Sequence, residues 1–169
     1  SDLHMAGFEV ASVDPPPDGT DTVEDAVIDL EITANRPDCL SVIGIAREVA
    51  TLYDATLRVQ PVASLGAADA APGGELQVTI DDPGRCPRYC AARAEVRIGP
   101  SPAWMERRLA AAGVRPINNV VDITNYVLIE LGHPMHAFDF ERLGGRELRI
   151  RTARPGERIT TLDGEDRAL

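Results

Sequence analysis

The stretch from residue 115 to residue 139 constrains the fold more than any other part of the chain. Between Pro116 and Gly132 a set of mostly apolar residues recurs at the helical period. The members of this set are Ile117, Val120, Val121, Thr124, Leu128 and Leu131. Pro116 suits the first helical turn, and Gly132 suits the position just past a helix end. The pattern therefore predicts an amphipathic helix that ends before Gly132.

Polar residues form a second stripe on the same predicted helix. Asn118, Asp122 and Asn125 fall at i, i+4 and i+7 and so share one side. Pro134 blocks further helix, and His136 follows in a short extended segment that ends at Asp139. Two interpretations are open at this point. Such a stripe is most often a solvated face, and a histidine after a helix is most often structural, but the same residues could also line a small polar pocket.

Charge and composition exclude several functional classes. The net charge of −10 argues against a general nucleic-acid-binding surface, because phosphate contacts need clustered cations. All 17 basic residues are arginines, and six of them crowd the C-terminal part, at Arg142, Arg146, Arg149, Arg151, Arg154 and Arg158. The three cysteines form no CxxC pair, so neither a disulfide framework nor a zinc finger is expected. No apolar run reaches membrane-spanning length, and we expect a cytoplasmic protein with no membrane partner.

The remaining elements follow from local patterns along the 169 residues. Alternation predicts strands over residues 7–13, 27–33, 57–62, 75–80, 88–98, 147–152 and 159–162. Further helices are expected over 39–53 and 102–112, the second with Ser101 as its N-cap. Gly44 lies inside the first of these helices, where glycine costs about 1 kcal/mol relative to alanine. A close approach of another backbone segment would explain it.

Strands and helices are mixed without strict alternation, which predicts an α+β fold with mixed or antiparallel sheets and packed helices. We expect an N-terminal α+β region over 1–62, a linker over 63–74 that is rich in Ala and Gly, and a second region over 75–169.

Three segments, 29–50, 114–139 and 151–169, resemble the β subunit of bacterial phenylalanyl-tRNA synthetase. The resemblance is carried by the strings NRPD at 35–38, PINNVVD at 116–122, TNYV at 124–127 and HAFD at 136–139. It covers nearly the whole chain outside its two linkers. It implies that residues 75–169 form the first part of the domain that edits mischarged tRNA.

The resemblance also implies an activity and a set of site residues. The editing domain hydrolyses tyrosine wrongly attached to tRNA(Phe), and its attacking group is a positioned water. By position in the motifs, His136 is the catalytic candidate and contacts the tyrosine phenol. Thr124 and Asn125 line the amino-acid pocket, and Arg115 lies at its polar edge.

The same resemblance implies the partners and cofactors of the parent enzyme. That enzyme charges tRNA(Phe) with phenylalanine, uses ATP and Mg²⁺ on its α subunit, and is an α2β2 heterotetramer. No cofactor is expected in this chain itself.

The chain departs from the family pattern at two places. Typical members carry a tRNA-binding OB-type domain after the region that resembles residues 5–10, whereas only residues 11–26 intervene here. The opposite wall of the pocket, which includes a glutamate and a Gly-rich loop, belongs in the family to sequence after Leu169. We therefore expect a partial editing domain that is inactive alone and has open strand edges.

Two alternative functions are kept. One is a metal-dependent hydrolase that uses His133, His136, Asp139 and Glu141. The other is a non-catalytic RNA-binding or scaffold module that uses the C-terminal arginines, although these arginines would more simply solvate the face of a sheet.

Overall fold

The computed structural model describes residues 7–16, 26–59, 76–161 and 163–169. The chain divides into two compact units, and each of them is built from two separate segments. The first unit combines Ser1–Ala63 with Val96–Ala137, and the second combines Ser64–Glu95 with Phe138–Leu169. The expected linker over 63–74 lies outside the described residues, so that boundary stays a prediction.

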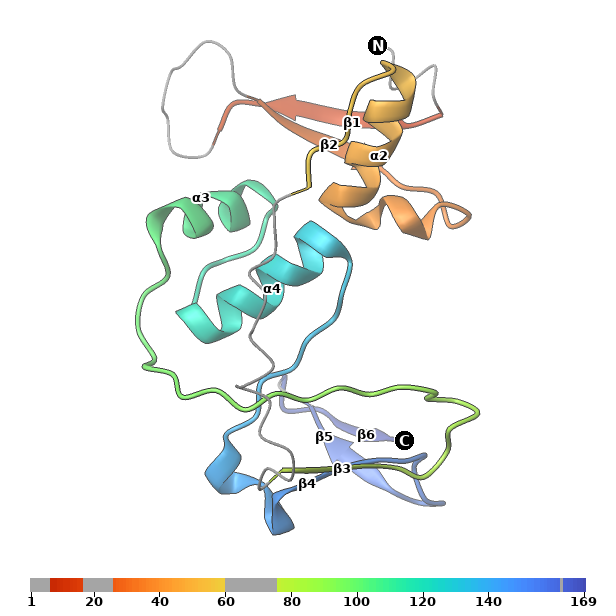
Figure 1. The fold of residues 1–169 in the computed structure, drawn as a ribbon, viewed down its shortest axis with the longest axis vertical. Helices are drawn as coiled ribbons and strands as arrows, with labels where there is room; N and C mark the ends of the chain where they lie inside the picture. The colour runs from red at the N-terminus through yellow and green to blue at the C-terminus, as the bar shows by residue number, and fades with distance from the viewer. Residues whose placement is uncertain (1–6, 17–25, 60–75, 162) are drawn as a thin grey trace. The chain divides into compact units, whose positions relative to one another are not determined.

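The first unit holds an antiparallel hairpin and three α-helices (Figure 1). Strand β1 (Glu9–Asp14) pairs with β2 (Val27–Glu31), with an irregularity between Val10 and Ser12. A 3-10 turn, η1 (Pro37–Leu40), leads into α2 (Val42–Leu52). Helix α4 (Asn119–Leu131) packs against both α2 and α3 (Ala103–Ala111). The buried apolar residues of the described chain all belong to this unit, and they are Phe8, Cys39, Met105 and Leu109.

Helix α4 starts and stops on local signals. Asn118 is the N-cap, and its Oδ1 accepts hydrogen bonds from the N–H groups of Val120 and Val121, both at 3.1 Å. Gly132 ends the helix with φ +71°, in the left-handed region that favours glycine, as predicted. The expectation for Pro116 was wrong: it lies outside the helix, because the Asn118 side chain sets a later start.

The buried side chain of α4 is a polar one. Asp122 is only 1 % exposed, so its interpretation as part of a solvated stripe was wrong. Leu128 and Leu131, on the opposite side, are 45 % and 49 % exposed. The C-terminal part of the apolar face of α4 is therefore about half exposed among the described residues.

Helix α3 begins one residue later than expected and ends one residue earlier. Its N-cap position is Pro102, which makes no side-chain capping bond, so the prediction for Ser101 was wrong. The Ser101 hydroxyl is used elsewhere, because it donates a hydrogen bond to the Asp122 carboxylate.

The second unit contains two separate strand pairs and two 3-10 turns. Strand β3 (Gln77–Ile80) runs parallel to β4 (Glu147–Ile150). Strand β5 (Arg158–Thr160) pairs antiparallel with β6 (Asp166–Ala168) around the turn at Gly164. The turns are η2 (Phe140–Arg142) and η3 (Gly144–Arg146). Helices and mixed sheets together confirm the α+β class.

The predicted strand over residues 88–98 was wrong, and the described part of the one over 57–62 forms no strand. Residues 88–98 alternate in sequence but form no ladder in the structure, and Val96 and Ile98 are exposed. Residues 57–59 are likewise not in a strand, and residues 60–62 lie outside the described part. Alternation alone does not make a strand, because the backbone groups also need a partner. No helix in the described ranges is long and apolar enough to cross a membrane.

Candidate functional site

The residues predicted to form a site lie on α4 and on the segments that flank it. Thr124 and Asn125 are half-buried neighbours near the middle of the helix. The Thr124 hydroxyl donates a 2.7 Å hydrogen bond to the carbonyl of Val121, which fixes its rotamer against its own helix. Arg115 and His136 are exposed and lie beyond opposite ends of α4. The structure thus brings Thr124 and Asn125 together and leaves Arg115 and His136 at the two margins.

Asp122 fastens this helix to the chain that precedes it. Its carboxylate accepts hydrogen bonds from the Ser101 hydroxyl at 2.6 Å and from the Ile117 N–H at 2.8 Å. A buried carboxylate is tolerated only when it is bonded in this way. Ile117 follows Arg115 by two residues, so Asp122 also holds the backbone that carries this site candidate. Sequence reasoning missed the role of Asp122 because its donor Ser101 lies 21 residues away.

Asn119 makes a second connection between the same segments. Its side-chain amide donates to the carbonyl of Arg97 at 2.9 Å, and its Oδ1 accepts from the N–H of Gly99 at 3.2 Å. Its own backbone N–H donates to the Gly99 carbonyl. The asparagine pair at 118–119 therefore has a structural role: one residue caps α4 and the other holds the extended segment before α3.

The NRPD string at 35–38 builds an ionic cluster around one guanidinium. Arg36 Nη2 lies 2.9 Å from Asp38 Oδ2 and 2.7 Å from Glu48 Oε1, and the Arg36 guanidinium lies over the ring of Phe8. The hydrogen bond from Arg36 lowers the pKa of Asp38 to about 2, and the contact with Cys39 adds to this. Burial raises the pKa of the Cys39 thiol. This cluster connects η1 and α2 with Phe8, the residue before β1.

One potential cation site occurs among the described residues, and it does not fit a metal ion. Asp38, Cys39 and Glu48 present ligand atoms within 4.8 Å of one another. The Arg36 guanidinium already donates to all three of these side chains. A metal ion there would have to displace a positive charge that satisfies the same atoms.

The hydrolase alternative based on His133, His136, Asp139 and Glu141 gains no support. Within the described part of the chain these residues form no three-ligand group. The Asp139 carboxylate is used locally, where it accepts from the Glu141 N–H at 3.1 Å and pairs with Arg142.

Carboxylates neutralise most of the C-terminal arginine strip. Among the described residues of the second unit, five ion pairs join arginines of the strip or near it to acids: Arg142–Asp139, Arg149–Asp81, Arg151–Glu157, Arg158–Asp166 and Arg167–Asp163. The bond from Arg151 lowers the pKa of Glu157 to about 2. A phosphate would have to compete with these partners, which weakens the RNA-binding alternative and favours a solvated sheet face.

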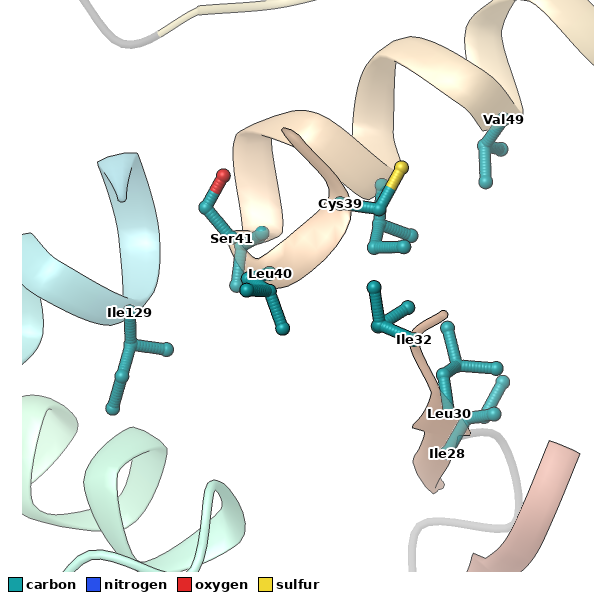
Figure 2. Close-up of a pocket in the computed structure, with 10 residues that line it drawn as sticks. Ile28, Leu30, Ile32, Cys39, Leu40, Ser41, Val49 and Ile129 are labelled. Atoms are coloured by element: carbon teal, nitrogen blue, oxygen red, sulfur yellow. The ribbon is translucent and has the colours of Figure 1, made fainter. Parts of the chain in front are cut away.

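An apolar hollow in the first unit has none of the predicted site residues in its lining (Figure 2). Its volume is about 480 Å³, and β2, η1, α2 and Ile129 of α4 line it. Its polar lining is limited to Ser41 and the Cys39 thiol. Figure 2 shows Ile28, Leu30 and Ile32 along one wall. Such a surface can bind apolar groups but offers no general acid or base at neutral pH.

Residues 85–169 match the B3/4 domain family, and the chain belongs to this family. The chain is also similar to proteins named phenylalanine–tRNA ligase beta subunit. It is 54% identical over 148 residues to the one from Anaeromyxobacter dehalogenans, which covers 87% of this chain and 18% of that protein. It is 46% identical over 181 residues to the one from Moorella thermoacetica, and the match covers 96% of this chain and 22% of that protein. It is 43% identical over 164 residues to the one from Shouchella clausii, and the match covers 95% of this chain and 20% of that protein.

These similarities confirm the resemblance inferred from the motifs. The chain spans about a fifth of the length of the curated relatives it matches.

Proposed function

We propose that this chain is part of a phenylalanine–tRNA ligase β subunit and contributes to the hydrolytic removal of tyrosine from mischarged tRNA(Phe). The observation that carries the proposal is similarity to β subunits so named over 87–96% of the chain, together with the B3/4 match. The partners that follow are the synthetase α subunit, in an α2β2 assembly, and tRNA(Phe), and the expected location is the cytoplasm.

The chemistry of the charging step explains why a second, hydrolytic site is needed. An apolar pocket shaped for phenylalanine cannot strongly reject a ligand that only adds a hydroxyl, and discrimination stalls near ~10²-fold. A separate site that hydrogen-bonds the phenol can do better, because phenylalanine would leave its polar groups unpaired.

The proposed roles are those that the resemblance implies for the four candidates on and beside α4. His136 hydrogen-bonds the tyrosine phenol, Thr124 and Asn125 line the amino-acid pocket, and Arg115 lies at the polar edge. Water supplies the attacking oxygen, the ester bond to the tRNA breaks, and tyrosine and free tRNA are released. By the resemblance, ATP and Mg²⁺ belong to the α subunit.

The uncovered face of α4 supports a pocket that further protein completes. Thr124 shares this face with Leu128 and Leu131, which are about half exposed, and Met135 is exposed in the segment after the helix. An apolar surface of this kind beside polar candidates is typical of one wall of a binding pocket. We infer that protein outside these 169 residues supplies the second wall.

Substitution of His136 in the intact α2β2 enzyme tests the proposal. His136→Ala should slow clearance of Tyr-tRNA(Phe) by about 10- to 100-fold, the effect of losing a hydrogen bond worth about 1.5–3 kcal/mol. Charging with phenylalanine should be unchanged. His133→Ala is the matched control, because His133 is also exposed and lies three residues earlier. Equal clearance by the His136→Ala and wild-type enzymes would remove His136 from the mechanism.

A further inference from the structure

The carboxylate of Asp122 joins three segments of the first unit. Asp122 and Ser101 are both buried, and the Ser101 hydroxyl donates to Asp122 Oδ2 at 2.6 Å. The backbone N–H of Ile117 donates to the other oxygen, Oδ1, at 2.8 Å. One donor lies just before α3 and the other just before α4. Each oxygen of this buried carboxylate therefore holds a different segment against α4.

Residues 115–117, which lead into α4, have little else to hold them. Arg115 is exposed and Ile117 is 69 % exposed, so burial fixes neither of them. Pro116 has no N–H to donate. Within the described residues, the backbone of 115–117 makes a single hydrogen bond, which is the one from Ile117 to Asp122. Asp122 therefore determines how this segment enters the helix.

Helix capping and the satisfaction of polar groups do not explain the bond from Ile117. The side chain of Asn118 already caps α4 and satisfies two N–H groups of its first turn. The N–H of an exposed residue such as Ile117 could otherwise bond to water, so it does not need a buried carboxylate. The remaining effect of the bond is positional. Because Asp122 belongs to α4, it fixes residues 115–117 relative to the helix that carries the pocket candidates.

We propose that Asp122 is a positioning residue for the editing reaction: it holds the backbone of residues 115–117 so that Arg115 stays at the polar edge of the amino-acid pocket. This inference rests on the proposed function, which gives Arg115 its role. Asp122 is buried, so it acts through the backbone and not by contact with the substrate. An arginine side chain is long and has many rotamers, so its guanidinium is aimed only if the backbone beneath it is fixed. A displacement of about 1 Å at a reacting site can cost about 10²-fold in rate.

Clearance of Tyr-tRNA(Phe) by the intact α2β2 enzyme tests this role. Asp122→Ala should slow clearance about tenfold, because Arg115 loses its fixed position. Asp122→Asn should restore most of the rate, since its amide oxygen can still accept from Ile117 and its NH₂ group can donate to the Ser101 oxygen. Ser101→Ala is the matched control: it removes the other bond to the same carboxylate and should leave clearance near the wild-type rate. Unchanged charging with phenylalanine shows that each variant is assembled.

A double-mutant cycle separates positioning from a general loss of structure. If Asp122 acts through Arg115, Asp122→Ala should change clearance by less than about twofold in an enzyme that already carries Arg115→Ala. The same substitution should keep its full effect in a His136→Ala enzyme. His136 lies beyond the other end of the 13-residue helix, roughly 20 Å away, where effects add independently. A general loss of structure would slow clearance in both backgrounds alike.

A second variant keeps the test decisive if Asp122→Ala does not fold. Asp122→Leu combined with Ser101→Ala has nearly the outline of the wild-type pair and leaves no buried hydroxyl without a partner, and such exchanges can be nearly neutral for stability. It still offers Ile117 no acceptor, so it should slow clearance about tenfold. Hydrogen exchange measured in peptides that cover residues 115–117 should also be faster than in the wild type.

Three results would overturn the proposal: wild-type clearance by the variants that lack the acceptor, an equal loss in Ser101→Ala, or an undiminished effect of Asp122→Ala in the Arg115→Ala background. Slow clearance by Arg115→Ala with normal clearance by Asp122→Ala removes only Asp122 and leaves the editing proposal standing. Normal clearance by Arg115→Ala removes both residues, and the His136 test is unaffected. A wild-type enzyme that does not clear Tyr-tRNA(Phe) refutes the proposed function itself.

Discussion

Replacing Gly44 with alanine should destabilise the first unit, although alanine is the better helix former. Gly44 is buried in the first turn of α2, close to the backbone of Asp38 in η1. A Cβ built there would lie 1.8 Å from the Asp38 carbonyl oxygen and 2.8 Å from the Asp38 carbonyl carbon. Both atoms are backbone, so no rotation of a flexible side chain can relieve the overlap.

Two opposing effects decide whether Gly44→Ala raises or lowers the free energy of unfolding. Helix propensity favours alanine over an interior glycine by about 1 kcal/mol. Against this, η1 would have to move by about 1 Å or more, and overpacking of a filled site costs about 1–3 kcal/mol or more. The movement would also stretch the 2.7 Å contact of Arg36 with Glu48, a half-exposed pair worth at most about 1 kcal/mol. We expect a net loss of about 2 kcal/mol.

Urea unfolding followed by Trp104 emission measures this loss, because Trp104 belongs to the same unit. With a slope of about 1–3 kcal/mol per molar urea, the midpoint should fall by about 1 M. Gly99→Ala is the matched control, because nothing lies within 4 Å of the position that its Cβ would take, and the φ of Gly99 is ordinary. A midpoint for Gly44→Ala equal to or above that of the wild type would show that η1 yields easily and that the close approach is not a constraint.

Three further outcomes are expected in the same unfolding assay. Asp122→Ala should lower stability by about 3 kcal/mol, because the Ser101 hydroxyl and the Ile117 N–H lose their charged acceptor, and Ser101→Ala should cost less. Gly132→Ala should cost about 1 kcal/mol, since φ is +71° there; no loss would contradict the left-handed cap. The bond with Arg36 lowers the pKa of Asp38 from 3.8 to about 2, so its stabilisation is complete above about pH 4 and is lost as pH falls towards 2. Asp38→Asn should flatten that part of the pH profile.

Local signals were sufficient to predict the helices. The cap at Asn118, the glycine at 132 and the apolar period together define α4 to within a few residues. The prediction that Gly44 marks a close backbone approach is confirmed, because the Asp38 carbonyl occupies the space that a Cβ would need.

Interactions between distant residues could not be predicted in the same way. The burial of Asp122 depends on a hydroxyl 21 residues earlier, and the pairing of β3 depends on β4, which lies far along the chain. Strand β6 is short, polar and exposed, so its sequence carries no alternation to detect. Residues 88–98 have the alternation but no partner in the described chain.

In the candidate site, too, the positions of residues along a helix could be predicted, whereas their side-chain contacts could not. The motifs place Thr124 and Asn125 on one helix, and the structure agrees. They could not indicate that Thr124 bonds its own helix, or that Asp122 is buried.

The parallel pairing of β3 with β4 sets an order in which this protein can form during synthesis. Ile80 pairs with Ile150, and at about 5–20 residues per second the ribosome needs roughly 4–14 s to make the chain between them. During that interval α3 and α4 emerge and can join the earlier hairpin and α2. The helical unit can therefore fold first, while β3 has no partner strand until β4 is synthesised. A nascent chain stalled before β4 would carry a finished helical unit and an open strand, which is the state that chaperones bind.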